Sequence, residues 1–278
     1  MPPDVTDWTL TNDRGLELLG TTHTPEGEPV ACVLLLHGFL GYKDYGFLPV
    51  LSDRLCVQGV QVHRFNFSCS GMTNATDTFE RPELFEQDTW NRQVEDVRRV
   101  ARSVREGELP GAGLPLWLVG HSRGGDTAIL SAGRHASELG LSGLVTINAP
   151  ADCCRLSEGE RRDLLERGHK EVTSGRTGQT LCVGRAWLEE QLAEPAEHDL
   201  EIQIARAACP VVVMQGDADD TVSLDDGNRL ARAANTDLVV LEGGTHVLNV
   251  PNPAGPGDPG PVLGHAAREI LGRVTQCL

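Results

Sequence analysis

The sequence predicts an α/β fold in which a mostly parallel, doubly wound sheet of about eight strands is covered by helices on both faces. Short, continuous apolar runs recur along the chain, as expected for strands buried on both faces of a parallel sheet. Segments with helical periodicity separate these runs, and the connections are short. This alternation implies right-handed crossovers between parallel strands. A chain of 278 residues is long enough for one such domain.

The elements follow in order from the N-terminus. Two weak strand signals, near residues 8–10 and 16–21, flank the turn-forming residues 12–15, which predicts a hairpin at a sheet edge. The first central strand is predicted at residues 30–36, an apolar run that ends at His37-Gly38. The elements predicted after it are a helix over 47–58, a strand over 60–65, a helix over 89–106, a strand over 116–119, a helix running to about 135, and a strand over 143–148.

The alternation breaks between residues 149 and 208, where the chain is charged and helix-like. Helices are predicted there at 158–168 and 185–194, with a Gly/Thr-rich stretch at 173–180 between them. We therefore expect residues 1–149 and 209–278 to form the α/β core, and residues 150–208 to form a small helical cap inserted over the sheet edge. The elements predicted after this insertion are a strand over 211–215, a helix over 224–234, a strand over 238–241, a Pro/Gly-rich loop over 251–261 and a helix over 265–274.

The composition excludes several classes of partner. The formal net charge of −16 repels nucleic acids and anionic lipid surfaces, because binding to either depends on Lys and Arg. No apolar run approaches the roughly 20 residues needed to span a bilayer. The N-terminus, Met1-Pro2-Pro3-Asp4, lacks the basic and then apolar pattern of a signal peptide. We expect a cytoplasmic protein that binds neither nucleic acid nor membrane, and the sequence does not predict its oligomeric state.

The cysteines do not form a recognisable metal or disulfide pattern. The chain has 8 of them, with no CxxC pair and no Cys/His ligand spacing. Several lie inside apolar runs, where a free thiol behaves as a small hydrophobic group. We expect buried reduced thiols and no metal or other cofactor. The cysteines are Cys32, Cys56, Cys69, Cys153, Cys154, Cys182, Cys209 and Cys277.

Residues 120–124, Gly-His-Ser-Arg-Gly, match the G-x-S-x-G pattern of a nucleophile elbow, a tight turn that exposes a serine hydroxyl between a strand and a helix. Side chains at Gly120 and Gly124 would collide with neighbouring backbone when the turn closes. The pattern alone is weakly specific, but here it stands between an apolar strand and a predicted helix. Ser122 is therefore the candidate nucleophile.

A serine nucleophile needs a general base, and that base must be oriented by a carboxylate. Candidate carboxylates follow the strand at 211–215, where Asp217, Asp219 and Asp220 stand close together. His246 follows the strand at 238–241 and is the only later histidine at a strand end, since His265 belongs to a predicted helix. An acid and then a histidine therefore follow Ser122 at the ends of two later predicted strands.

These loops resemble those of the α/β-hydrolase superfamily. Residues 216–222 contain G-x-x-D-x-x-V, which looks like the superfamily's acid loop, and residues 243–246, Gly-Gly-Thr-His, look like its histidine loop. The resemblance implies that Asp219 is the acid and His246 the base, with Asp217 and Asp220 as loop carboxylates. Asp152 is a further alternative, because some members of the fold place the acid after the preceding strand.

The tetrahedral intermediate of acyl transfer needs hydrogen-bond donors for its oxyanion, and backbone amides serve because they are fixed in advance. One such donor is the amide of Arg123, the residue after the nucleophile. The second follows from resemblance, because His37-Gly38-Phe39 is similar to the HG-x oxyanion loop of the family and points to the amide of Phe39.

The resemblance extends from the strand at residue 30 to the last helix. Within the superfamily the chain resembles bacterial carboxylesterases, cinnamoyl or feruloyl esterases and serine aminopeptidase-like hydrolases, while residues 41–47 look like a segment of uncharacterised bacterial hydrolases. This implies a serine hydrolase that cleaves a small carboxylic ester through an acyl-enzyme intermediate. Ser122 in the nucleophile position argues against the haloalkane dehalogenases and epoxide hydrolases, which use aspartate.

Other functions remain open from the sequence. The same Ser-Asp-His arrangement serves amidases, peptidases and thioesterases, and some proteins of this fold are binding proteins without activity. The nature of the substrate pocket is also open. Hydrophobic residues of the oxyanion region and of the insertion either line an apolar acyl pocket or belong to the core. These residues are Phe39, Leu40, Tyr42, Tyr45, Trp187, Leu188 and Leu192.

Overall fold

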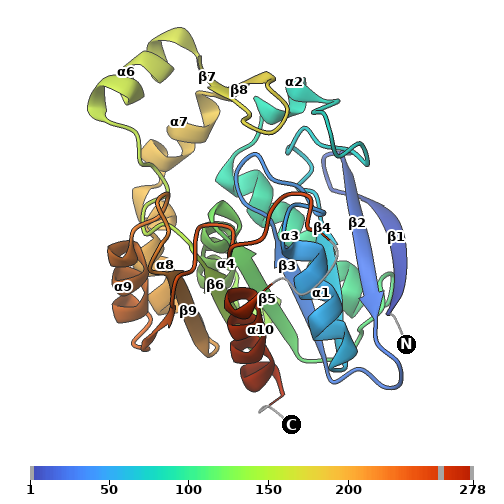
Figure 1. Ribbon diagram of the computed structural model, residues 1–278. Coiled ribbons are helices and arrows are strands. Elements are labelled where there is room, and N and C mark those ends of the chain that lie inside the picture. The colour runs from blue at the N-terminus through green and yellow to red at the C-terminus, as the bar shows by residue number, and fades with distance from the viewer. Residues whose placement is uncertain (1–2, 256–259, 276–278) are drawn as a thin grey trace.

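The computed structural model describes residues 3–255 and 260–275 and is built around a sheet of eight strands (Figure 1). Their order across the sheet is β1-β2-β4-β3-β5-β6-β9-β10, and the pairs from β4 to β10 are parallel. The predicted α/β fold with a mostly parallel sheet is confirmed. The strands are β1 (Asp4–Thr11), β2 (Glu17–Thr24), β3 (Ala31–Leu36), β4 (Val60–Phe65), β5 (Leu116–His121), β6 (Gly143–Ile147), β9 (Val211–Gly216) and β10 (Leu238–Leu241).

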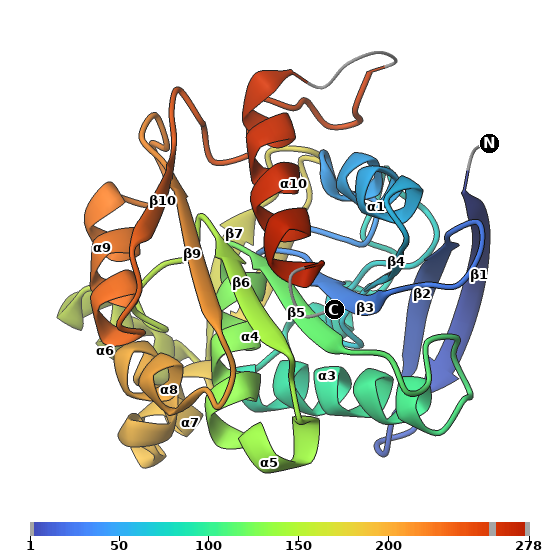
Figure 2. The ribbon, with the colours of Figure 1, turned by 90° about the horizontal axis from the view of Figure 1, so that it is seen from below.

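The helices lie in layers on both faces of the sheet, as Figure 2 shows. Helices α1 and α10 cover one face and bury one apolar cluster, whereas α3, α4, α8 and α9 cover the other face and bury a second cluster. Every residue of β3, β4, β5 and β6 is buried, which explains the mostly apolar sequences of β3, β5 and β6, whereas β4 also buries Gln61, His63 and Arg64. These helices are α1 (Leu48–Val57), α3 (Trp90–Arg105), α4 (Arg123–Arg134), α8 (Leu200–Arg206), α9 (Leu224–Ala233) and α10 (Pro261–Val274), and the short α5 (Ala136–Leu139) follows α4.

The predicted N-terminal hairpin and C-terminal helix are both present, but the helix begins earlier than predicted. Strands β1 and β2 form the expected antiparallel hairpin, and β2 pairs antiparallel with β4. Helix α10 begins at Pro261 and not at residue 265, because proline is favoured at the first helical position. Residues 256–259 of the predicted Pro/Gly-rich loop lie outside the described residues. All cysteines of the described residues are free, and Cys277 lies beyond them.

The segment from 150 to 208 contains strands that the sequence pattern did not predict. Helix α6 (Glu158–Arg167) leads into β7 (His169–Thr173), which pairs antiparallel with β8 (Thr180–Gly184), and α7 (Ala186–Ala193) follows. The Gly/Thr-rich stretch that looked like a loop is the tip of this two-stranded hairpin. Figure 1 shows these elements projecting above the sheet. The hairpin contacts the chain just after the short helix α2 (Pro82–Phe85). There the amide of Gly184 donates to the carbonyl oxygen of Glu86 at 3.1 Å.

Helix α8 belongs to the helical layer below the cap, although its sequence was assigned to the insertion. It packs against α4 at Gly133, where an added Cβ would lie 2.4 Å from the carbonyl oxygen of Gln203. Ile204 and Leu200 are buried in the same apolar cluster as α3 and α4. The division of the chain into core and cap at residues 150 and 208 stays a prediction, and α8 supports placing the end of the cap earlier.

We predict that Gly133→Ala lowers the free energy of unfolding by about 1–3 kcal/mol, because the new methyl group overpacks the contact between α4 and α8. Gly159→Ala in α6 is the matched control, since its Cβ would meet no atom within 4 Å and alanine favours a helix. Urea denaturation of both variants measures the difference. Equal stability of the two variants would contradict the close packing of α8 on α4.

Candidate active site

Ser122 occupies a sharp turn between β5 and α4. Its backbone has φ 53° and ψ −128°, a strained conformation for a residue with a side chain. An added Cβ would lie 2.2 Å from the carbonyl oxygen of Gly124 if placed on Gly120, and 2.5 Å from the carbonyl oxygen of His37 if placed on Gly124. The steric need for both glycines is therefore confirmed.

The structure brings Ser122, His246 and Asp219 together in one hydrogen-bonded chain. His246 Nε2 lies 3.1 Å from Ser122 Oγ, and His246 Nδ1 lies 2.9 Å from Asp219 Oδ2. The carboxylate acceptor fixes the tautomer, so that Nδ1 carries the proton and Nε2 accepts from the serine hydroxyl. In this geometry Nε2 is placed to take the proton of Ser122.

Asp219 is fully buried and held by several donors. Its Oδ1 accepts from the amides of Thr221 (2.8 Å) and Val222 (2.9 Å), and its Oδ2 accepts from Gln215 Nε2 at 3.1 Å. Burial by itself raises the pKa of Asp219, but the hydrogen bonds from His246 and from the two amides outweigh it and lower the pKa below the ordinary value. Asp219 is therefore ionised beside His246 at neutral pH.

The backbone of the histidine loop is tied to the neighbouring strands. The carbonyl oxygen of His246 accepts from Asn148 Nδ2 at 3.0 Å and contacts His121 Nε2 at 2.7 Å. Asn148, just after β6, also accepts from the amide of Gly216 through its Oδ1 at 2.8 Å. From the sequence, Asn148 is predicted only as the end of a strand. Its backbone has a positive φ of 52°, and its contacts with His246 and Gly216 join distant segments, so no local sequence pattern indicates this role.

The alternative carboxylates and the later histidine make other contacts. Asp217 accepts from the amide of Gly243 at 2.6 Å, and Asp220 accepts from its neighbour Thr221. Asp152 forms two hydrogen bonds with Arg229, at 2.6 and 3.0 Å. His265 lies on α10 and pairs with Glu269 of the same helix. None of these side chains contacts His246 within the described residues.

The amides expected to form the oxyanion hole belong to segments next to Ser122. An added Cβ on Gly38 would lie 3.0 Å from Ser122 Cβ, so the loop with Phe39 passes close to the nucleophile. The amide of Arg123 opens α4, where the first turn of a helix leaves its N–H groups without helical partners. Neither amide has a hydrogen-bond acceptor within residues 3–255 and 260–275. Both are therefore available to a ligand oxygen, and the oxyanion role stays a prediction.

Residues 41–47, which follow the predicted oxyanion loop, are hydrogen-bonded to Asn252 in the segment after His246. Tyr42 donates through its hydroxyl group to Asn252 Oδ1 at 3.2 Å, and the amide of Gly46 donates to the same oxygen at 2.8 Å. The amide of Lys43 donates to Asn66 Oδ1 at 2.7 Å, which fixes the segment to the end of β4. Tyr42 and Tyr45 therefore belong to the packing of this segment and do not line the cavity described next.

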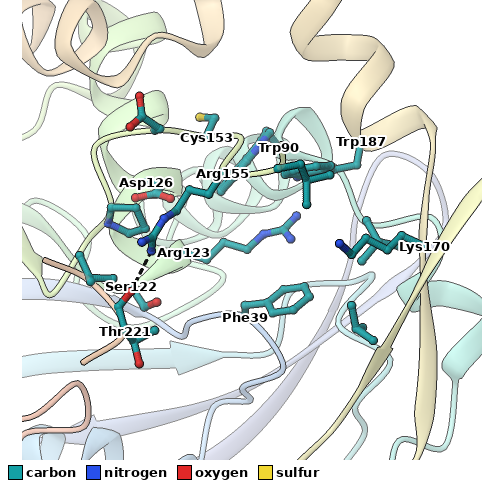
Figure 3. Close-up of a pocket in the computed structure, with 16 residues that line it drawn as sticks. Phe39, Trp90, Ser122, Arg123, Asp126, Cys153, Arg155, Lys170, Trp187 and Thr221 are labelled. Atoms are coloured by element: carbon teal, nitrogen blue, oxygen red, sulfur yellow. Dashed lines mark hydrogen bonds between the residues drawn. The ribbon is translucent and has the colours of Figure 1, made fainter. Parts of the chain in front are cut away.

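A cavity of about 290 Å³ opens beside Ser122, between the sheet edge and the cap (Figure 3). Phe39 and Trp187, two of the hydrophobic residues considered from the sequence, line it. Leu188 lies in the core instead, and Leu192 is exposed. The complete lining is Phe39, Trp90, Ser122, Arg123, Asp126, Pro150, Asp152, Cys153, Arg155, Leu156, Lys170, Val172, Val183, Trp187, Thr221 and Val222.

Comparison with known proteins agrees with this geometry. A sequence profile described as the alpha/beta hydrolase family matches residues 33–255. The chain belongs to this family. No curated protein matches the sequence significantly. The match spans the strands and loops that carry Ser122, Asp219 and His246, as well as the cap.

Solved structures share the fold at low sequence identity. Est1E from Butyrivibrio proteoclasticus, determined with ferulic acid bound, has a TM-score of 0.71 and 17% identity, over 96% of this chain and 99% of that chain. The esterase domain of a Rhodothermus marinus protein has a TM-score of 0.63 and 23% identity, over 97% and 96%. Dienelactone hydrolase from Anabaena variabilis has a TM-score of 0.61 and 13% identity, over 98% and 99%. The structural neighbours therefore include bacterial esterases.

The part of the chain that the structure describes contains neither a candidate membrane span nor a cluster of metal ligands. No helix among these residues is both long and apolar enough to cross a bilayer. No group of three or more His, Cys, Asp or Glu side chains among them is arranged to hold a metal ion.

We predict that the stability conferred by His121 falls as the pH falls. Burial, with a contribution from the neighbouring His246, lowers the pKa of His121 from 6.5 to about 3. The unfolded chain therefore binds a proton between these values that the folded chain excludes, which costs the wild type about 3 kcal/mol between pH 6.5 and pH 4. Gln at position 121 removes this cost.

The measurement is the difference in unfolding free energy between wild type and His121→Gln from pH 8 to pH 4. Groups common to both proteins cancel in this difference. The advantage of the wild type should be largest at pH 8 and should shrink steadily below pH 6.5. A difference that does not vary with pH would show that His121 titrates normally in the folded protein.

Proposed function

We propose that this protein is a carboxylesterase in which Ser122 is the nucleophile, His246 the general base and Asp219 the residue that orients the base. The observation that supports it is the hydrogen-bonded chain from Ser122 Oγ through His246 to Asp219 at the wall of a cavity. A serine hydroxyl is a weak nucleophile unless an adjacent base removes its proton. Here the base is within reach and its far nitrogen is held by a buried carboxylate.

In the first half of the reaction, Ser122 Oγ attacks the carbonyl carbon of the ester while its proton moves to His246 Nε2. The imidazolium that forms is stabilised by the ionised Asp219, which stays unprotonated. The carbonyl oxygen becomes an oxyanion, and the amides of Phe39 and Arg123 are placed to bind it. Collapse of the tetrahedral intermediate breaks the bond to the alkoxy oxygen. The proton on His246 then passes to that oxygen, and the alcohol leaves.

The second half repeats these steps with water as the nucleophile. His246 Nε2 takes a proton from water, the hydroxide attacks the acyl carbon bound to Ser122, and the same amides bind the second oxyanion. Collapse releases the carboxylic acid, and the proton from His246 restores the hydroxyl group of Ser122. The partial exposure of the His246 side chain, at 18%, allows water to reach it.

An ester is favoured over an amide as the substrate. An alkoxide leaves more readily than the anion of an amine, so ester cleavage demands less of the general acid than amide cleavage does. Esterases among the structural neighbours support the same choice, although their identities show only a shared fold. Amides and thioesters react through the same steps, so direct comparison of matched substrates decides between them.

We predict that a fluorophosphonate probe labels the wild type covalently at Ser122 and that Ser122→Ala abolishes both labelling and ester hydrolysis. Loss of a triad member lowers turnover by about 10⁴-fold or more in enzymes of this mechanism. Ser131→Ala is the matched control, because Ser131 lies on the helix that follows Ser122 and, among the described residues, its hydroxyl group bonds only to the carbonyl of Thr127. It should be labelled normally.

The same assay separates the alternatives. Labelling that persists in Ser122→Ala would place the reactive residue elsewhere, and a folded wild type that is not labelled would favour a binding protein. A screen of 4-nitrophenyl esters of increasing acyl length, with matched amides and thioesters, then identifies the acyl compound that the protein cleaves fastest.

We predict that Phe39→Ala retains part of the activity on small esters, because the oxyanion donor at this position is the backbone amide. The side chain packs on Phe85 with ring centroids 5.6 Å apart, and it lies on the cavity wall. Its removal should raise KM more than it lowers kcat, with kcat falling less than about tenfold. Complete loss of turnover in a folded Phe39→Ala protein would contradict a purely backbone role.

A further inference from the structure

Basic side chains gather at the cavity beside Ser122, although the chain as a whole is strongly acidic. Arg123 from α4, Arg155 from the segment after β6 and Lys170 from β7 all line it. The formal net charge of the protein is −16. Three cations around one small cavity therefore set its local potential apart from that of the surface as a whole.

Arg123 is buried and has one donor left for a ligand. Its guanidinium carbon lies 4.5 Å from the ring centroid of Trp90 and 5.4 Å from that of Phe39, and Nη2 lies 3.1 Å from Asp88 Oδ2. Nε and Nη2 are buried from solvent. Nη1 is not buried, and it has no hydrogen-bond acceptor within the described residues. Figure 3 shows the side chain reaching into the cavity above Phe39. Nη1 is therefore the nitrogen that meets a ligand there.

Arg155 has no carboxylate partner within residues 3–255 and 260–275. Its Nη1 donates to the carbonyl oxygen of Thr221 at 2.9 Å, which holds the guanidinium at the loop that carries Asp219 (Figure 3). Lys170 pairs with Glu160 at 2.5 Å, and Arg123 pairs with Asp88. Of the three cations, Arg155 is therefore the one that forms no ion pair within the described residues.

The carboxyl groups of the lining do not cancel this charge. Burial raises the pKa of Asp126 well above its ordinary value, which disfavours the charged form of its carboxyl group. Asp152 is engaged by both terminal nitrogens of Arg229. The local balance is therefore positive, and it favours a ligand with a negative charge.

We propose that this cavity binds the acyl part of an ester that carries a second, free carboxylate, with Arg155 and Arg123 Nη1 as the donors to that carboxylate. Leu156, Val172 and Val183 supply apolar wall elsewhere in the same cavity. The substrate class is accordingly a half-ester of a dicarboxylic acid with a hydrocarbon body. This inference rests on the proposed esterase function, which it narrows to a substrate class.

The test compares two substrates of equal length that differ in charge. The mono-4-nitrophenyl ester of suberic acid carries the free carboxylate, and the 4-nitrophenyl ester of suberic acid monoamide is its neutral counterpart. The wild type should prefer the charged ester by about tenfold in kcat/KM at low salt, as expected for a hydrogen bond to a charged group. The preference should fall as salt is added, because an exposed guanidinium is screened.

Arg155→Gln should reduce this preference to about twofold or less by raising KM for the charged ester alone. Glutamine removes the positive charge and keeps a polar side chain at this position. Arg185→Gln is the matched control: Arg185 also lies in the segment between β6 and β9, is exposed, pairs with Glu189 and does not line the cavity. It should keep the full preference.

Binding to Ser122→Ala tests the subsite without turnover. Titration calorimetry with the two intact esters should show a Kd about tenfold lower for the charged one, and Arg155→Gln in the same background should remove the difference. Equal Kd values, or a preference that survives Arg155→Gln, would overturn the carboxylate subsite. Absence of labelling and hydrolysis together with retained selective binding would instead reject the esterase function while leaving the anion site in place.

Discussion

The close approach of three backbone segments at the turn after β5 is the constraint on which the rest of the site depends. Gly120 and Gly124 leave no space for a Cβ, and the oxyanion loop packs against Ser122 at Gly38. This packing holds Ser122 at a positive φ, so that its hydroxyl group stands clear of α4. The strain is sustained because β5 is paired on both sides by fully buried strands. A residue with a freer backbone would not present the hydroxyl in one direction.

The positions of the acid and the base follow from the same sheet. Ser122, Asn148, Asp219 and His246 follow β5, β6, β9 and β10, which are consecutive neighbours in the strand order. Parallel strands end at one edge, so loops far apart in the sequence converge there. Asn148 and His121 then hold the backbone of His246, and Gln215 holds Asp219. The strand ends that carry His121, Asn148 and Gln215 therefore help to set the distances between the three side chains.

The predicted cap, residues 150–208, adds charged and aromatic side chains to the wall of the cavity. It brings Arg155, Lys170 and Trp187 over a sheet edge that would otherwise be open to water. Trp187 lies with Trp90 near the guanidinium of Arg123, with the centroid of its ring 5.9 Å from the guanidinium carbon, so aromatic walls and cations share one small volume. Residues 150–208 therefore supply much of the wall that a ligand of this cavity would contact.

The sequence by itself determined the strands, the elbow at Ser122 and the order in which an acid and a histidine follow it, because these features depend on local periodicity and on motifs of a few residues. It identified Asp219 among three adjacent carboxylates only through resemblance to a family. The tertiary structure alone decided that β7 and β8 pair, that α8 packs on Gly133, and that Arg155 and Arg123 line one cavity. These are contacts between segments distant in the sequence, and no local pattern encodes which surfaces the folded chain brings together.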